Sequence, residues 1–493
     1  MRNFSRFFLA TGMLFLSVSG SSIAQKAIII QPSFTYMDCR SMAVPPAPGD
    51  TLKVLAGRIQ TLKFKYLQGS KEKPIVVINS GGQVGIATTA WGALAFENCQ
   101  FIKVTGTGDK KIHFGFKLQG LECGLSFSEY STDCEVEFVE IQGGRTSFFG
   151  IYAKKDFGGN PPVPYPQFNN LLIHNNYIHD VAEGLYIGET KSPGMEFRHV
   201  RIYNNVIENT GRESAQLANC VQDIEVHNNL FSNSGLENLA FQNNCLQVGG
   251  NTIGKYYNNI LINSPGYGAI ILGMGNIEVY NNYVESCIGS FIDDRYTPIA
   301  GSAVTVRNNY FKSARGAEII KNMNQYNLMY FKDNRYDAAI PFLNNAGGMP
   351  PTLVNTGNIF TSVPVMLFNT VNGEYKINPG GPIEYRQIGP LSPEINSKRI
   401  LKSGTVGSPY NGGLVEISAS KYLAYPNPVI DRLTIAPFEN GMTYKIFNSS
   451  GEMILTGKQE SLSTSGLAKG AYFLTVHDSN GKPVHQAKII KAK

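Results

Sequence analysis

The sequence predicts an all-β protein: a right-handed parallel β-helix, in which the chain winds into stacked coils, followed by a small C-terminal β-sandwich. The first observation is a short motif that recurs seven times at a regular spacing. The second is a composition rich in turn-forming residues, with 51 Gly, 25 Pro and only 16% charged residues in 493, as in a large all-β chain. The third is a change of pattern near residue 421, after which short alternating strands replace the repeat.

The repeated motif is a run of alternating apolar residues closed by a polar pair. Successive copies lie 23 to 30 residues apart. A repeat of this length with period-2 alternation is one coil of a β-helix, because a single coil cannot bury its apolar face alone. The second residues of the polar pairs are Asn176, Asn205, Asn229, Asn259, Asn282, Asn309 and Asn334.

Strand alternation assigns a side to each residue of a coil. In VRIYNNVI it places Val200 and Ile202 inside and Arg201 and Tyr203 outside. Asn205 suits the corner because Asn tolerates left-handed backbone angles, and stacked Asn amides can form a ladder from coil to coil. We therefore interpret the polar pairs as structural.

Residues 1–25 have the pattern of a secretory signal peptide. Arg2 and Arg6 precede an apolar run at 7–18, and small residues follow up to Ala24. This pattern predicts an exported chain, and no later segment offers the run of about 18 apolar residues that a membrane-spanning helix needs. Without the two arginines the net charge falls from +6 to +4, and no basic run suggests a nucleic-acid partner.

The seven cysteines are an odd number for an exported protein, so at least one thiol is expected to stay unpaired. Cys123 and Cys134 are close enough in sequence for a bridge, and no pair has the spacing of a zinc site. We expect most of the cysteines to be buried thiols, because Cys packs as a small apolar residue.

The β-helix is assigned to residues 26–337. Its opening contains Pro48-Gly49-Asp50, Ala56-Gly57 and Lys73-Pro74-Ile75. This stretch resembles the first coils of carbohydrate-active parallel β-helix proteins. The resemblance implies a fold type and leaves the activity open.

Two excursions interrupt the coils and are predicted loops: a Pro-rich stretch at 158–168 and a second one at 295–301. Long loops on a rigid solenoid are where binding surfaces usually form. Residues 338–420 are interpreted as final coils, a cap over the open sheet end and a linker.

Residues 422–493 form a separate unit with its own motifs. They contain Tyr425-Pro426-Asn427-Pro428, a Leu-x-Ile strand at Leu433–Ile435, the residues Gly470-x-Tyr472-x-Leu474 and a basic tail. In this order the motifs resemble the C-terminal sorting domain of the type IX secretion system. The resemblance implies that the type IX machinery carries the chain across the outer membrane, to be released or held at the cell surface, and we expect it to act there as a monomer.

Function must come from outward side chains, because a β-helix has no active site imposed by its fold. Aligning the strands that follow the polar corners predicts an outward row of Tyr186, Gln216, Ala240, Phe291 and Glu318. Around its end the sequence gathers the candidate catalytic residues Asp293, Asp294, Arg295, Glu318 and Lys321.

This acidic and basic strip suits more than one chemistry. Asp293 and Glu318 on adjacent coils would have backbones roughly 8 Å apart, which permits a two-carboxylate glycosidase. A lyase would instead use Lys321, Arg295 or Tyr296 as the base, with a cation neutralising a uronate carboxylate. The carboxylates also suit Ca²⁺ as a cofactor, and a solvated, salt-bridged edge without chemistry is the alternative.

Outward aromatic and charged residues predict where a sugar chain would lie, because aromatic faces pack on sugar rings. The candidate substrate-binding residues are Tyr152, Lys154, Tyr186, Glu189, Phe291 and Tyr296. A weaker group consists of His174, His179, Asp180 and Glu183, and His174 shares an outward row with Tyr203, His227 and Tyr280.

Two family motifs were compared with the strip. Gly316-Ala-Glu-Ile-Ile-Lys-Asn resembles a strand motif of β-helix alginate and chondroitin lyases, whose following Arg-His-Gly element is replaced here by LMYFKDNRY. Of the polygalacturonase motifs only Asp293-Asp294 is present. The sequence therefore predicts an extracellular polysaccharide-active protein, a lyase or a glycoside hydrolase, with a non-catalytic glycan-binding or adhesin-like surface protein as the alternative.

Overall fold

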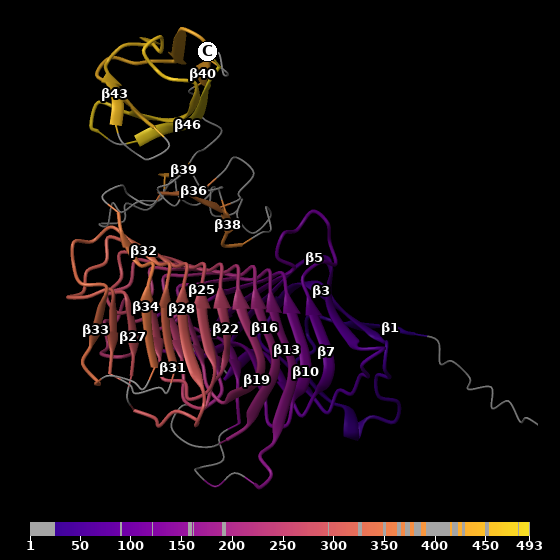
Figure 1. Ribbon diagram of the computed structural model, residues 1–493. Helices are drawn as coiled ribbons and strands as arrows, with labels where there is room; N and C mark the ends of the chain where they lie inside the picture. The colour runs from indigo at the N-terminus through magenta and orange to yellow at the C-terminus, as the bar shows by residue number, and fades with distance from the viewer. Residues whose placement is uncertain are drawn as a thin grey trace, which may run out of the picture.

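The computed structural model describes residues 25–88, 91–120, 122–155, 160, 162–189, 194–293, 295–323, 328–348 and 352–361, and shorter stretches between 366 and 492. The predicted signal peptide lies outside these residues except for Gln25. The chain forms a parallel β-solenoid, which confirms the predicted fold class. Figure 1 shows its coils stacked side by side from β1 to β34.

Two parallel sheets build the solenoid, and a typical coil contributes one strand to the smaller sheet and two to the larger. The smaller, 12-stranded sheet consists of β2 (Tyr36–Asp38), β4 (Leu62–Lys65), β6 (Gly92–Glu97), β9 (Cys123–Ser128), β12 (Phe149–Ala153), β15 (Glu183–Ile187), β18 (Ala215–Leu217), β21 (Leu246–Val248), β24 (Ala269–Ile271), β27 (Ser290–Ile292), β30 (Ile320–Asn322) and β33 (Leu343–Asn345).

The larger, 23-stranded sheet wraps around the corner that the polar pairs make. It consists of β1 (Ala27–Ile30), β3 (Thr51–Ile59), β5 (Ile75–Thr88), β7 (Gln100–Thr105), β8 (Phe116–Gly120), β10 (Thr132–Glu137), β11 (Val139–Gln142), β13 (Gln167–His174), β14 (Tyr177–His179), β16 (Glu196–Tyr203), β17 (Val206–Glu208), β19 (Cys220–His227), β20 (Leu230–Ser232), β22 (Gly254–Tyr257), β23 (Ile260–Ile262), β25 (Ile277–Tyr280), β26 (Tyr283–Glu285), β28 (Ala303–Arg307), β29 (Tyr310–Lys312), β31 (Leu328–Lys332), β32 (Arg335–Tyr336), β34 (Thr352–Thr356) and β35 (Ile359–Phe360).

Both members of each polar pair form the corner: the first turns the backbone, and the second bonds to the next coil. Asn204 takes the left-handed backbone with φ 55°, whereas the sequence had assigned this conformation to Asn205. Asn205 is fully buried, and its Nδ2 donates to Oδ1 of Asn229 in the next coil at 3.0 Å. The same bond joins Asn229 to Asn259 and continues along the solenoid, so the predicted amide ladder is confirmed.

The core fills the inside of the coils. Val200 and Ile202 are fully buried, as strand alternation predicts. All seven cysteines are buried and free, which confirms buried thiols and shows that a Cys123–Cys134 bridge is wrong. The two alternating sides of the strands therefore separate the core from the outward rows.

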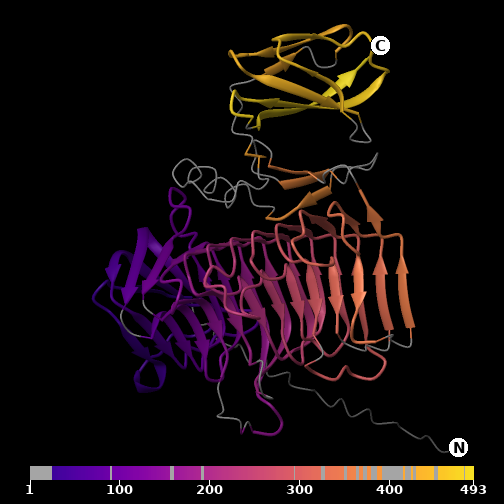
Figure 2. The same cartoon turned by 90° about the vertical axis from the view of Figure 1, so that its left-hand side faces the viewer.

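The coils continue beyond residue 337, through β33, β34 and β35. A small sheet of β36 (Met366–Asn369), β37 (Tyr375–Asn378), β38 (Arg386–Ile388) and β39 (Val415–Glu416) follows. Figures 1 and 2 both show it beside the corner edge of the solenoid. There the backbone N–H of Gly389 donates to the carbonyl of Asn258 at 2.8 Å.

The C-terminal unit has two antiparallel sheets around its own core, which includes Leu433, Ile446 and Leu474. Apart from strands the described chain has one 3₁₀ turn, Cys39–Ser41. Among the described residues, no helix has the length and apolar character needed to cross a bilayer. The strands of the unit are β40 (Leu423–Tyr425), β41 (Arg432–Ala436), β42 (Thr443–Phe447), β43 (Met453–Gly457), β44 (Ser461–Ser463), β45 (Gly470–His477) and β46 (Pro483–Lys491).

Candidate functional site

The outward face of the 12-stranded sheet carries most of the residues that the sequence singled out. The strand register decides which of them share its central row. The sequence alignment placed Ala240 and Glu318 in this row, but Ala240 lies in a turn before β21, and Glu318 lies two residues before β30 begins. Lys321, and not Glu318, pairs with Phe291. The row consists of Tyr152, Tyr186, Gln216, Gln247, Ile270, Phe291 and Lys321.

Four aromatic side chains gather at the N-terminal end of the row, and we call Trp91, Phe149, Tyr152 and Tyr186 the aromatic platform. The ring centroid of Trp91 lies 5.2 Å from that of Tyr152, edge to face, and the ring of Tyr186 lies 5.1 Å from that of Phe149. Trp91 is 44% exposed and the other three are half-buried. The sequence predicted both tyrosines and missed Trp91 and Phe149, although Trp91 is the only tryptophan of the chain.

The ammonium group of Lys154 is held against this platform. Its Nζ lies 3.8 Å from the ring centroid of Tyr186 and 5.4 Å from that of Tyr152, and 3.2 Å from Oε2 of Glu189. Burial acts to lower the pKa of Lys154, but the hydrogen bond to Tyr186 and the neighbouring charges outweigh it, so the pKa is raised. Burial raises the pKa of Tyr152 to about 12. At neutral pH the platform therefore offers the ammonium group of Lys154 and the protonated phenol of Tyr152.

The C-terminal end of the row holds the predicted catalytic strip. Asp293 is only 4% exposed, and its carboxylate accepts from the backbone N–H of Arg295 at 2.8 Å and from the Arg295 guanidinium at 2.7 Å. These bonds close a turn and pair the charge, which favours a structural role for Asp293. Asp294 lies outside the described residues.

Phe291 was expected to face water, and this is wrong. Its side chain points outward but is only 7% exposed, because Tyr267 stacks on it at 5.1 Å and Phe241 approaches it to 6.4 Å. The cations sit at the edge of this apolar cover. Nζ of Lys321 lies 5.8 Å from the Phe291 ring, and the guanidinium of Arg295 lies 5.3 Å from the Phe241 ring.

Tyr267, which the sequence analysis did not single out, is brought near both carboxylates of the strip. Burial raises its pKa, and the charges of Glu318 and Asp293 raise it further. Burial likewise raises the pKa of Tyr296, where Arg295 opposes the shift and Asp293 adds to it. Both phenols therefore stay protonated at neutral pH, which suits hydrogen bonding better than proton abstraction.

The weaker histidine group is separated by the fold. His174 ends β13, Glu183 begins β15 in the other sheet, and His179 pairs with Asp180 at 2.8 Å near the second corner. The four residues therefore do not form a single site.

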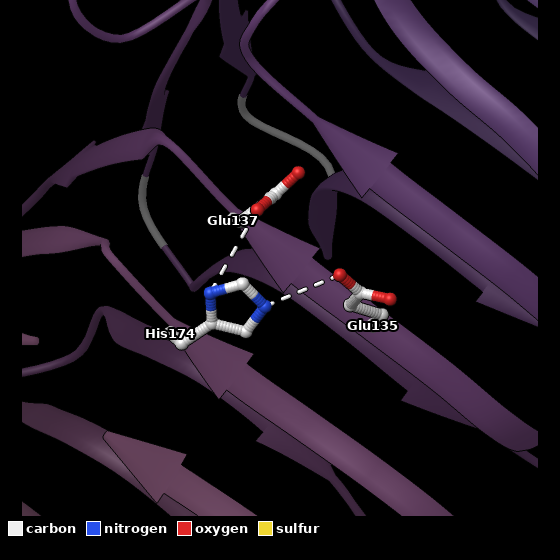
Figure 3. A group of neighbouring side chains, drawn as sticks. All are labelled: Glu135, Glu137 and His174. Carbon is white, nitrogen blue, oxygen red and sulfur yellow. Dashed lines mark hydrogen bonds and ion pairs between the residues drawn. The ribbon is translucent and has the colours of Figure 1, made fainter. Parts of the chain in front are cut away.

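His174 instead lies between two glutamates of the preceding coil (Figure 3). Its Nε2 is 3.2 Å from Glu135 and its Nδ1 is 3.7 Å from Glu137. In the described part of the chain this is the one group of three potential ligands close enough to hold a metal ion. However, the ammonium of Lys103 contacts both carboxylates, at 2.6 and 2.9 Å, so one of the two negative charges is already balanced and the arrangement favours an ion-pair network over a metal site.

The predicted outward row that begins at His174 is confirmed as a ladder of parallel rings on the 23-stranded sheet. Successive centroids lie 4.6 to 5.3 Å apart with interplanar angles of 4 to 8°. Because each ring face covers the next, the ladder presents ring edges to solvent, unlike the mixed orientations of the platform. Its rings belong to His174, Tyr203, His227, Tyr257 and Tyr280.

Comparison with known proteins adds the identity of the C-terminal unit. Residues 423–492 match the family described as the secretion system C-terminal sorting domain, as its sequence motifs predict. A search of curated proteins gives no match.

Three solved structures similar to this chain are two polysaccharide lyases and an epimerase. The pectate lyase Pel9A is 11% identical with a TM-score of 0.33, covering 68% of this chain and 82% of that one. A PL6 family polysaccharide lyase from Pseudopedobacter saltans is 15% identical with a TM-score of 0.33, covering 66% and 92%. The periplasmic alginate epimerase AlgG is 11% identical with a TM-score of 0.29, covering 68% and 85%.

The solenoid and its tail together define the class: a parallel β-helix protein with a sorting domain of the type IX secretion system. This domain indicates export to the cell surface or secretion.

Proposed function

We propose that this protein binds an extended extracellular polysaccharide along the outward face of the 12-stranded sheet. The observation that carries the proposal is the aromatic platform, where rings at mixed angles lie beside the fixed ammonium of Lys154. Aromatic faces provide apolar contact for sugar rings, and the Lys154–Glu189 pair provides a donor and an acceptor for hydroxyl groups. Both features are present without any rearrangement of the described residues.

The length of the face suits a chain rather than a single sugar. Six coil intervals separate Tyr152 from Lys321 in the central row, which is roughly 29 Å at the spacing of β-strands. Gln216 and Gln247, which are 8% and 5% exposed, occupy the middle, and Arg295, Tyr296 and Lys321 add polar groups at the far end. In this proposal Tyr152, Tyr186 and Tyr296 contact successive sugars, whereas Phe291 supports the surface from beneath Tyr267.

The binding experiment uses the full chain without its signal peptide. Tyr152→Ala and Tyr186→Ala are each expected to weaken binding to soluble glycans by about tenfold, which corresponds to about 1.4 kcal/mol. Tyr280→Ala is the matched control, because Tyr280 is an outward, half-buried tyrosine of the ring ladder on the other sheet. Equal losses for all three variants, or none, would refute the proposed location.

Cleavage of the bound chain, by a lyase or a glycoside hydrolase, is the second candidate. What favours it is that Asp293 and Glu318 both act on Tyr267, so two carboxylates and a phenol share one end of the face. New reducing ends, or the absorbance of unsaturated uronates, would reveal turnover. Glycan binding without either product, unchanged in Lys321→Ala, would instead support an adhesin-like surface protein.

A further inference from the structure

We infer that the aromatic platform selects uncharged glycans over polyuronates, because the charges around it leave an excess of carboxyl groups. The inference rests on the proposed function and names the substrate class of the same site. Two buried glutamates, Glu183 and Glu213, lie beside the platform.

The two glutamates are neighbours in the stacking direction. Glu183 pairs in register with Phe149 of the platform and lies three residues before Tyr186 on the same strand. In the next coil, the carbonyl of Glu213 accepts from the N–H of Gly184 at 3.2 Å. One coil rise, about 4.8 Å, therefore separates their backbones.

Both side chains are almost fully buried, with exposures of 3% for Glu183 and 0% for Glu213. Asn244 donates to Oε1 of Glu213 at 3.2 Å. The buried atoms Oε1 of Glu183 and Oε2 of Glu213 have no hydrogen-bond partner. Because two buried carboxylates side by side cannot both ionise cheaply, burial and the neighbouring charge raise the pKa of Glu183, and burial raises the pKa of Glu213 to about 7. The pair therefore holds at least one proton and is only partly ionised at neutral pH.

Each described cation near the platform already has a carboxylate partner. Lys154 pairs with Glu189, Lys155 with Glu129, and Arg212 with Glu237. Over the described residues, neither Glu183 nor Glu213 forms an ion pair of its own.

The charges of Lys154 and Arg212 do reach Glu183 and act to lower its pKa, but burial and the charge of Glu213 prevail and raise it. Glu122, at the start of the neighbouring coil, is a further exposed carboxylate. The next basic residues along the sheet are Lys63 and Lys65. Both form ion pairs with Glu97, which lies two coils before Tyr152.

The consequence for a ligand follows from the sign of this excess. A uronate at the platform would bring a carboxylate against Glu189 and the partly ionised Glu183–Glu213 pair, and could bind Lys154 only by displacing Glu189. A neutral sugar uses the same rings and hydroxyl partners without that repulsion. If the bound chain is cleaved at the platform, hydrolysis is therefore favoured over β-elimination, which needs a uronate carboxylate.

The test compares soluble xylan and β-glucan with alginate and polygalacturonate, using the full chain without its signal peptide. At low salt the neutral glycans are expected to bind at least about tenfold more tightly than the polyuronates. Their binding should change little with salt, because no ion pair to the ligand is involved. Glu213→Gln, which keeps the size of the side chain and removes its charge, should strengthen polyuronate binding severalfold and leave neutral binding unchanged.

Glu278→Gln is the matched control, because Glu278 lies on the 23-stranded sheet and pairs with Arg307. Tighter, salt-sensitive polyuronate binding by the unmodified chain, or equal effects of the two Gln variants, would overturn the inference. If polyuronate binding is lost in Tyr152→Ala, the platform remains the site and only its selectivity is wrong. Binding of every glycan unaffected by Tyr152→Ala would refute the proposed function itself.

Discussion

Replacing Glu213 by Gln is expected to stabilise the protein, although Glu213 is fully buried. Burial raises the pKa of this carboxyl from 4.5 to about 7, against the opposing effects of a backbone hydrogen bond, Asn244 and Arg212. The unfolded chain gives up the proton near the ordinary value, so the folded state holds it more tightly. The stabilisation that the bound proton gives the folded state is therefore fully present below about pH 4.5, and it is lost as the pH rises through about 7.

The size of the effect follows from this shift. A difference of about 2.5 pKa units at about 1.36 kcal/mol each gives roughly 3 kcal/mol at pH 8. A Gln side chain can still accept from Asn244 and does not titrate, so Glu213→Gln avoids the loss. For a chain of this size the gain corresponds to a rise in melting temperature on the order of 5 °C.

Thermal unfolding of the full chain, followed by calorimetry from pH 4 to pH 8, measures this difference. The melting temperatures of Glu213→Gln and the unmodified protein should separate progressively above pH 4.5, whereas Glu278→Gln should run parallel to the unmodified protein. A variant that is less stable at pH 8, or a difference independent of pH, would show that the carboxyl is ionised and compensated and would refute the reasoning.

Three further outcomes are expected. Asn229→Ala removes the donor to Ile202 and the acceptor for the N–H of Asn205, and should lower stability by about 2–5 kcal/mol; calorimetric loss below about 1 kcal/mol would contradict the ladder's role. The hydrogen bond from His174 lowers the pKa of Glu135 to about 2, helped by Lys103 and opposed by burial. The ionised Glu135 therefore stabilises the fold above about pH 4.5, and this stabilisation is lost as the pH falls toward 2. Glu135→Gln should therefore reduce stability at pH 7 by on the order of 1 kcal/mol, since the pair is partly exposed, and the difference should vanish in acid melts. Deleting 423–492 in the native cell should keep the protein from the surface and the medium, and undiminished export by fractionation would contradict the sorting role.

The coil architecture was predictable because it depends on local and repeated signals. Alternation placed Val200 and Ile202 inside, and the repeated Asn marked the corner. What the repeat could not predict was register where coils differ in length. Glu318 was aligned with Phe291 by counting from a glycine, but β30 begins later and brings Lys321 into that position.

The site was predictable only in part, because its members come from separate coils. Tyr152 and Tyr186 were found through outward alternation. Trp91 joins them from a coil some sixty residues earlier in the sequence, and no local pattern indicates that approach. Burial was equally hidden: Phe291 faces outward as predicted, yet Phe241, which precedes it by fifty residues, covers it.

Hydrogen–deuterium exchange of the full chain with and without a soluble neutral glycan tests the central claim most directly. The account predicts new protection in peptides that contain Trp91, Tyr152 and Tyr186, and no change at Tyr203 or Tyr257 on the 23-stranded sheet. Protection confined to the ring ladder, or bound glycan that leaves the platform peptides unprotected, would contradict it.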